Sequence, residues 1–557
     1  MAQPFTPAWL AHEPAATRLL DNPLSDLATA AARVVASRRA ASLDRTPVDV
    51  LEVLRSQEAQ RPRSAARDQA MDKLSSGAFV VATGQQVGLF LGPLYAIHKA
   101  ASAVVWARHF ERLLGHPVVP LFWLQTEDAD FDEVRSAHVP GPDGLITASI
   151  APDHTTDGRP LTDGCRVSLG QRLIGAQIAA TFDQIAPALT GAHADAVKLA
   201  LERCYGSGRT LGEAAGDLIA ELFADQGLLV FDPRPARGAS PATTQAFGDT
   251  MRFALERADA IESTLATRTS QLEAAGFDIQ VKAREHVALA CLHPDGPTGD
   301  RFRLVRSGDD DWTLSGAPGR FTTTELTQRP PDHLSTTALL RPLLQDRLFP
   351  TIAYVGGPGE IAYLSELPPL YELAGLPMPM ILPRARVQLS TPASRRLTEQ
   401  LGLPPDAWRL GEAELRRHLL GTHTELAPLD ALTTDLTSHL DQTFDALRTL
   451  ANQLGDNAFG KQADKARDQI DHTMARLIER LRRTALERND EERHRLTRLL
   501  ALIRPNDAPQ ERMLAFVTFA AQFGPRELVA KLVTHIASLL APDADPTTFA
   551  TVREVHL

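Results

Sequence analysis

The chain has 557 residues, of which 43% are hydrophobic and 23% are charged, which is ordinary for a globular protein of about two to four domains. Its formal net charge of −11 argues against non-specific binding to nucleic acid or anionic lipid, and no run reaches the roughly 18 apolar residues of a membrane helix. The start lacks a basic region followed by an apolar stretch, and the three cysteines are far apart and odd in number. We therefore expect a cytoplasmic protein with no nucleic-acid or membrane partner, no disulfide framework and no paired-cysteine zinc site.

The first part of the chain has the pattern of a strand, a loop and a helix. An apolar, β-branched run at 78–82 predicts a buried parallel strand. A glycine-containing loop follows, and a helix is expected after Gly92-Pro93, because proline suits the first turn of a helix. A second strand is predicted at 118–124, and it ends in an acidic run.

A similar unit lies about 270 residues later. Residues 351–355 are strand-like, 356–359 are the breaker Gly-Gly-Pro-Gly, and a helical stretch follows. The segment from Pro377 to Leu389 is interpreted as one more strand of the same sheet. Two strand–loop–helix halves predict an α/β fold with a doubly wound parallel sheet. The segment between them, roughly 150 to 330, mixes helical and β-like pieces such as FRLVRSG and is interpreted as an insertion carried by the core.

After about residue 395 the pattern becomes that of long helices. Apolar residues recur at spacings of three and four from Leu429 to Leu454 and, after LGDN, from Ala463 to Leu481. On charged helices this stripe predicts an antiparallel helical hairpin or a coiled coil. The predicted organisation is an N-terminal helical segment with the first half of the core (1–150), an insertion (151–330), the second half of the core (331–395), a helical arm (396–505) and a C-terminal helical segment (506–557).

Open α/β sheets bind ligands beyond the carboxyl ends of their strands, so the loops there supply the candidate site. The first loop and helix start offer backbone and side-chain groups for nucleotide or substrate binding, from Thr83, Gly84, Gln85, Gln86, Gly92 and Tyr95. His98 and Lys99 lie about one turn into the helix, from where they could reach a transferring phosphoryl group. The alternative is a tight turn with a buried histidine, since the loop is neither a P-loop nor a GxGxxG fingerprint.

The acidic run places five carboxylates between Glu127 and Glu133. Carboxylates this close repel one another unless a cation lies among them, which could be an ammonium group, Mg²⁺ or an arginine. We expect Glu127, Asp128 and Asp130 to point inward. The alternative is that Asp128 or Asp130 caps a following helix and that the others face water.

The second half supplies further candidates for substrate and nucleotide binding. Arginine on such loops can hold a carboxylate or phosphate at two points, although a salt bridge within the fold would use the same residues. The candidates are Arg341, Gln345, Asp346, Tyr354, Gly356, Gly357, Gly359, Glu360 and Arg384.

Four segments carry a resemblance to a known family. In order, they are TGQQVGLFLGPLYAIHK, FWLQTEDADFDEV, LLRPLLQDRLFPTIAYVGGPGEIAY and PQERMLAFVTFAAQFGP. As an ordered set they resemble the motifs of the bacillithiol-biosynthesis cysteine ligase family, BshC. The resemblance implies a Rossmann core related to class I aminoacyl-tRNA synthetases, connecting-peptide insertions and a coiled-coil arm associated with a homodimer.

The resemblance also implies a reaction, in which the carboxyl group of cysteine is joined to the amine of glucosaminyl-malate. ATP with Mg²⁺ would activate the carboxylate, as an acyl-adenylate or an acyl-phosphate. The loop at 83–99 would then bind phosphates, the acidic run would bind or deprotonate the amine, and nearby arginines would suit the malate carboxylates. Neither HIGH nor KMSKS occurs, and the sequence has no zinc signature. The alternatives are an adenylating enzyme for another amino acid or amine, and a non-catalytic, dimeric nucleotide-binding scaffold.

Overall fold

The computed structural model describes residues 2–162, 164–308, 310–421, 427–456, 459–488, 490–540, 548–549 and 551–557. The chain divides into two compact units. Unit 1 comprises Met1–Val139, Ile146–Leu389 and Glu511–Leu557, and unit 2 comprises Pro140–Leu145 and Ser390–Gln510. Within the described ranges, no helix combines the length and the apolarity needed to cross a lipid bilayer.

Unit 1 is built on a parallel sheet of five strands, in the order β14-β13-β1-β2-β7. The strands are β1 (Phe79–Gln85), β2 (Val118–Leu124), β7 (Leu229–Phe231), β13 (Thr351–Gly356) and β14 (Met380–Pro383). Ranked along the chain and read from β7, they follow the order 3-2-1-4-5 of a doubly wound sheet. The predicted α/β fold is therefore confirmed.

The sheet lies in the core, which explains why its strands are apolar along their whole length. Every residue of β2 and β13 is buried, and β1 is buried up to its last residue. Gly84 allows β1 and β2 to lie close together, because a Cβ atom there would come within 2.8 Å of the Trp123 carbonyl oxygen. The helices that contact the sheet include α3 (Leu27–Ala40), α5 (Ala65–Ser75) and α6 (Tyr95–Leu114).

Two details of the sheet differ from the sequence prediction. Strand β7 lies inside the interval 151–330 that was interpreted as an insertion, so the core draws on that interval too. The segment from Pro377 forms two strands, and only β14 belongs to the sheet. The second, β15 (Arg386–Ser390), pairs with β16 (Val552–His556), so the prediction of a single strand was wrong.

A second sheet in unit 1 is antiparallel and has the order β11-β10-β9-β8-β12. Its strands are β8 (Val287–Leu292), β9 (Phe302–Arg306), β10 (Asp311–Leu314), β11 (Ala317–Thr322) and β12 (Leu334–Thr336). The β-like piece FRLVRSG noted in the sequence supplies β9.

The other strands form two-stranded pairs: β3 (Ser136–Gly141) with β4 (Gly144–Ser149), and β5 (Pro152–Thr155) with β6 (Arg172–Ile174). The remaining helices outside unit 2 are α1 (Phe5–Leu10), α2 (Pro14–Thr17), α4 (Val48–Ala59), α7 (Phe131–Val134), α8 (Ile178–Ile185), α9 (Ala194–Cys204), α10 (Leu211–Leu222), α11 (Pro233–Ala236), α12 (Pro241–Glu256), α13 (Ala258–Ala274), α14 (Thr323–Thr327), α15 (Arg341–Leu348), α16 (Pro358–Leu364), α17 (Pro368–Ala374), α23 (Gln510–Met513), α24 (Val517–Phe523) and α25 (Pro525–Ser538).

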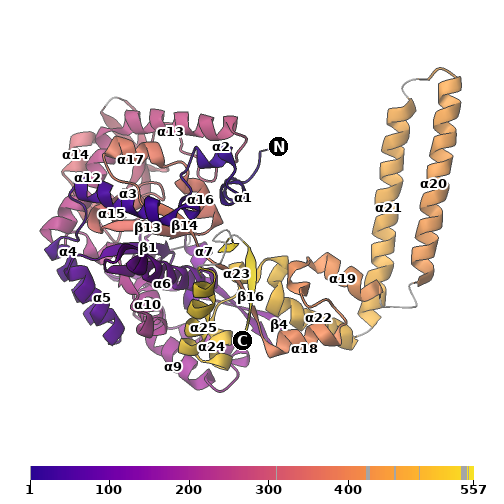
Figure 1. Ribbon diagram of the computed structural model, residues 1–557, viewed down its shortest axis with the longest axis horizontal. Coiled ribbons are helices and arrows are strands. Elements are labelled where there is room, and N and C mark those ends of the chain that lie inside the picture. Colours follow the sequence, from indigo (N-terminus) through magenta and orange to yellow (C-terminus); the bar gives the residue numbers. More distant parts are fainter. Residues whose placement is uncertain are drawn as a thin grey trace. The chain divides into compact units, whose positions relative to one another are not determined.

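Unit 2 is helical. Its helices are α18 (Pro392–Gln400), α19 (Glu412–Gly421), α20 (Ala427–Gln453), α21 (Phe459–Arg488) and α22 (Asp490–Ile503). Leucines of α18, α19 and α22 form its buried core. Helices α20 and α21 run side by side as an antiparallel hairpin (Figure 1), and Arg448 of α20 forms an ion pair of 2.6 Å with Asp464 of α21. The predicted helical arm is confirmed.

Candidate functional site

The candidate site lies at the topological switch point of the parallel sheet. In a sheet of this order, the connections that leave β1 and β13 diverge and leave a crevice at the carboxyl ends of the strands. Gln85 ends β1, Gln86 follows it, and Gly357 and Gly359 follow β13; all four line a cavity of about 600 Å³. This volume is within the usual range for small-molecule sites. The second sheet supplies another wall, with residues from β8, β9 and β12.

Lys99 lines this cavity and is almost fully buried, with 1% of its surface exposed. Its Nζ donates to the Gly84 carbonyl oxygen, to Gln85 Oε1 at 3.0 Å and to Glu360 Oε2 at 2.6 Å. An ammonium group has three N–H donors, so all of them are used. Lys99 therefore ties the end of β1 to the start of α16.

The Glu360 carboxylate is oriented by a network of buried partners. The Tyr354 hydroxyl donates to Oε1 at 2.8 Å, and the Gly357 N–H donates to Oε2 at 2.9 Å. Burial alone would raise the pKa of Glu360, but the Lys99 ammonium and these donors outweigh it and hold the pKa below its ordinary value. Arg341 extends the network, since its Nη2 lies 3.2 Å from the Tyr354 hydroxyl oxygen. Glu360 is thus ionised at neutral pH and fixed at the cavity wall.

Glu127 also lines the cavity, as expected, but its charge is already balanced by the protein. It accepts hydrogen bonds from the Thr336 N–H at 3.2 Å and from Thr336 Oγ1 at 2.6 Å, and it forms a buried ion pair with Arg237. Arg237 is the cation that the acidic run requires at this position. Glu127 therefore joins the end of β2 to β12.

The rest of the acidic run divides between the cavity and a helix cap. Asp128 and Glu133 both line the cavity, and Gln86 Nε2 donates to each of them at 2.8 Å. Asp130 does not line it; the Asp130 side chain is the N-cap of α7 and accepts from the Glu133 N–H at 3.3 Å. Among the described residues, Asp128 and Glu133 have no ion-pair partner, so they are the carboxylates available to a cationic group.

Arg384 lines the cavity and is held by a residue that lies 127 positions further along the chain. Its two Nη atoms donate to Glu511 at 2.7 and 3.0 Å, and Arg386 Nε donates to the same carboxylate at 3.1 Å. Burial alone would raise the pKa of Glu511, but the Arg384 guanidinium and the neighbouring His98 outweigh it and hold the pKa far below its ordinary value. Glu511 is therefore a buried anion that fixes two arginines.

His98 lies outside the cavity. It is completely buried, its Nδ1 lies 3.4 Å from Glu511 Oε2, and burial lowers the pKa of its ring. Consecutive residues of a helix point about 100° apart, so His98 and Lys99 cannot both face the same wall.

Several other predicted residues support the cavity without lining it. Thr83 Oγ1 donates to the Val355 carbonyl oxygen at 2.8 Å, which joins β1 to β13. Asp346 lies in the core, where it accepts from the Tyr371 hydroxyl at 2.5 Å and lies 3.6 Å from Arg38. The predicted residues outside the lining are Thr83, Gly84, Gly92, His98, Asp130, Gln345, Asp346, Tyr354 and Gly356. Those that line it are Gln85, Gln86, Tyr95, Lys99, Glu127, Asp128, Arg341, Gly357, Gly359, Glu360 and Arg384.

Sequence reasoning missed a group of cationic residues and their partner. Arg301 and Arg303 enter the cavity from the second sheet, and Glu511 and Arg512 enter from the segment after unit 2. The motif PQERMLAF contains the last two, but nothing in its spacing pairs them with Arg384. The β-like piece FRLVRSG contains Arg303 and begins directly after Arg301, but nothing in it points to the cavity.

The lining offers cationic side chains that could hold the phosphates of a nucleotide. Arg303 and Arg512 are exposed side chains with no ion-pair partner among the described residues, so they can neutralise phosphate oxygens. Mg²⁺ would come with the nucleotide and be held chiefly by its phosphates and water, because the described residues contain no cluster of three or more side chains that could hold a metal ion. The N-terminus of α6 is a poor phosphate site, because Leu94 and Ile97 there are fully buried.

Comparisons with known proteins agree with this architecture. Residues 2–385 match the family model described as "Bacillithiol biosynthesis BshC, N-terminal Rossmann-like domain", and residues 387–540 match "Bacillithiol biosynthesis BshC, C-terminal coiled-coil domain".

Curated relatives with the same family name align with this chain over most of their length. A protein of Salinibacter ruber is 30% identical over 452 residues, which is 80% of this chain and 79% of the relative. One from Carboxydothermus hydrogenoformans is 30% identical over 468 residues, 82% of each chain. One from Chlorobaculum tepidum is 29% identical over 513 residues, 88% of this chain and 86% of the relative. Each bears the name "Putative cysteine ligase BshC".

Proposed function

Because the chain belongs to the BshC family of bacillithiol biosynthesis, we propose that it joins the carboxyl group of cysteine to the amine of glucosaminyl-malate, with ATP as the activating co-substrate. In this proposal the chain is a ligase that forms an amide bond. The reaction is placed in the cytoplasm, where cysteines that form no disulfide, such as Cys165, Cys204 and Cys291, are the rule.

The observation that carries the proposal is the pairing of opposite charges across one cavity. Asp128 and Glu133 are free to bind an ammonium group, whereas Arg301, Arg303 and Arg512 are free to bind anionic oxygens. Glucosaminyl-malate carries an amine and two carboxylates, and both kinds of group therefore find complementary charges.

The residues of the chain bind and orient the reacting groups. A carboxylate and an ammonium group do not condense readily, and ATP, when bound, supplies the leaving group that the cysteine carboxylate lacks. Asp128 and Glu133 hold the amine and accept its proton. Lys99, Arg341 and Tyr354 keep Glu360 fixed beside the reacting groups, and Glu511 does the same for Arg384.

Asp128→Asn is expected to raise the KM for glucosaminyl-malate about 10-fold. The charged acceptor for the amine is lost, whereas asparagine keeps a neutral side-chain oxygen that Gln86 Nε2 can still hold. Asp130→Asn is the matched control, because asparagine caps helices as well as aspartate does. Its KM is expected to stay within about two-fold of the wild-type value. Steady-state kinetics at saturating ATP and cysteine measures both. An equal rise in the control would contradict the assignment of the amine to Asp128.

Turnover tests the proposed function directly. Purified protein would be incubated with ATP, Mg²⁺, cysteine and glucosaminyl-malate, and the products would be identified by mass spectrometry. Bacillithiol is the expected product, and AMP or ADP in the same sample identifies the bond of ATP that breaks. Folded protein that forms no bacillithiol would overturn the choice of substrates. ATP binding without turnover of any amine would favour a scaffold.

We further propose that the helical arm pairs two copies of the chain. Helices α20 and α21 and the turn after α20 leave Leu432, Leu450, Leu454, Leu477 and Leu481 more than half exposed, which is unusual for a stripe of this length. Light scattering is expected to give the mass of a dimer for the wild type. Leu450→Asp with Leu477→Asp is expected to give a monomer, and a monomeric wild type would contradict the proposal.

A further inference from the structure

Arg301 enters the cavity from the start of β9 with most of its guanidinium free. Its Nε donates to Ser335 Oγ at 3.0 Å and its Nη2 donates to the Thr336 carbonyl oxygen at 2.8 Å. A guanidinium has five N–H donors, so three remain, and no carboxylate among the described residues pairs with it. The free Nη edge therefore has the geometry to bind an anionic group at two points.

Behind Ser335 lies His293, which is completely buried and absent from the described cavity lining. Its Nδ1 lies 3.2 Å from the Gly299 carbonyl oxygen and its Nε2 lies 3.0 Å from Ser335 Oγ. A carbonyl oxygen can only accept, so Nδ1 carries the proton and Nε2 accepts from the serine hydroxyl. The chain of donors then runs in one direction, from Arg301 to Ser335, to His293 and to Gly299.

The imidazole must be neutral for this chain to exist. Burial and the nearby Arg234 and Arg237 lower the pKa of His293 to about 2. A charged imidazole would direct Nε2–H at a hydroxyl that already receives Arg301 Nε–H. The lone pair on Nε2 instead fixes the direction of the serine hydroxyl, which leaves its oxygen lone pairs turned to Arg301.

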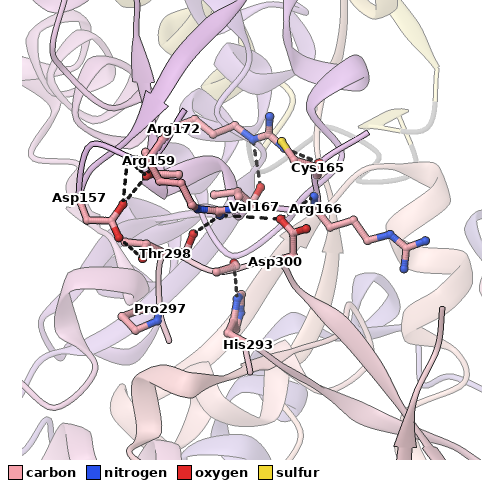
Figure 2. Close-up of polar contacts among 12 residues, drawn as sticks. Asp157, Arg159, Cys165, Arg166, Val167, Arg172, His293, Pro297, Thr298 and Asp300 are labelled. Atoms are coloured by element: carbon pink, nitrogen blue, oxygen red, sulfur yellow. Dashed lines mark hydrogen bonds and ion pairs between the residues drawn. The ribbon is translucent and has the colours of Figure 1, made fainter. Parts of the chain in front are cut away.

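The turn that carries Gly299 is itself anchored. Figure 2 shows Asp157 and Arg159 reaching Thr298: Thr298 Oγ1 donates to Asp157 at 2.7 Å, and Arg159 Nη2 donates to the Thr298 carbonyl oxygen at 2.7 Å. The Arg166 N–H donates to Asp300 at 3.2 Å in the same view. These bonds fix the turn that carries Gly299, at one end of the chain of donors. They also fix Arg301, at the other end, because Arg301 directly follows this turn.

We infer that His293 and Ser335 are positioning residues that aim the Arg301 guanidinium into the cavity, where it binds an anionic oxygen group of a substrate. The identity of that substrate rests on the proposed function: the group is a malate carboxylate of glucosaminyl-malate or a phosphate of ATP. β12 carries both Ser335, which holds Arg301, and Thr336, which holds Glu127, so one short strand sets a cation and an anion on the same wall.

The test is a double-mutant cycle read by steady-state kinetics for each substrate. Ser335→Ala is expected to raise one KM about 10-fold, and Arg301→Ala to raise the same KM about 100-fold, with kcat changed by no more than about three-fold. Because Ser335 acts through Arg301, the double variant is expected to match Arg301→Ala. A rise in the KM for glucosaminyl-malate identifies the carboxylate, and a rise in the KM for ATP identifies the phosphate.

Controls separate positioning from general loss of stability. Ser394→Ala removes a similarly buried hydroxyl from unit 2, and its KM values are expected to equal those of the wild type. His293→Gln, which keeps a side-chain acceptor, is expected to raise the KM less than His293→Ala does. Additive effects in the cycle, or an equal rise in every KM, would overturn the inference.

A binding measurement distinguishes a failure of this inference from a failure of the proposed function. If the wild type forms no bacillithiol, calorimetric titration with malate and, separately, with ATP gives the affinities of the same four proteins of the cycle. The inference is supported if Ser335→Ala binds either probe more weakly than the wild type and the double variant binds it no more weakly than Arg301→Ala. Unchanged affinity of both probes in Ser335→Ala and Arg301→Ala overturns it.

Discussion

Lys99→Met is expected to lower the free energy of unfolding by about 3–5 kcal/mol, because it leaves the Glu360 carboxylate buried without its cation. Turnover is expected to fall by about 100-fold or more, since Glu360 loses the partner that fixes it at the cavity wall. Urea denaturation followed by circular dichroism measures the first effect, and the bacillithiol assay measures the second.

A second substitution shows whether the charge pair is the cause. Adding Glu360→Gln to Lys99→Met removes the unpaired anion; the amide oxygen can still accept from the Gly357 N–H, and the Tyr354 hydroxyl can accept from the amide NH₂. The double variant is expected to regain about 1–3 kcal/mol relative to Lys99→Met, without regaining turnover. A double variant that is less stable than Lys99→Met would show that the two residues do not act as a pair.

Glu511→Gln is expected to lower the free energy of unfolding by about 3 kcal/mol at pH 7, because Arg384 is then buried without a charged partner. The isosteric amide keeps the volume, so the loss reports on the charge and on the one acceptor oxygen that the amide replaces. Glu399→Gln on the exposed surface of α18 is the control and is expected to change stability by less than about 0.5 kcal/mol.

The same comparison predicts a pH dependence. The folded pKa of Glu511 lies below its ordinary value of 4.5, so its ionisation stabilises the fold above that value. The contribution is lost as the pH falls from about 4.5 through the depressed folded pKa. The difference in stability between wild type and Glu511→Gln should therefore be constant above about pH 6 and shrink on acidification. A constant difference down to pH 2 would contradict the assignment.

The fold was largely predictable because buried parallel strands are apolar runs bounded by breakers. The runs at 118–124 and 351–355 fall on β2 and β13 within one residue. Strand β7 has only three residues, which is too short for its apolar run to be distinguished from a buried helix segment. The segment from Pro377 to Leu389 was interpreted as one strand. Only the pairing of its two parts with different sheets divides it between β14 and β15.

The site was predictable where it follows from strand ends, and not where it depends on tertiary partners. Gln85 ends β1, and Lys99 and Glu360 lie in the helices that follow β1 and β13; all three line the cavity. Glu511 and Arg301 reach the cavity from distant segments, and no local pattern connects them to it. The acidic run was expected to need a cation, yet Arg237, which pairs with Glu127, lies 110 residues further along the chain.

The pairing of Arg384 with Glu511 has a consequence for how the protein is made. A ribosome completes every strand of the parallel sheet well before it reaches residue 511, and it synthesises the whole of the helical arm in between. During that interval the nascent core holds Arg384 without its counter-ion. The cavity is thus assembled last, and a chain released after the arm would have its sheet but not a finished site.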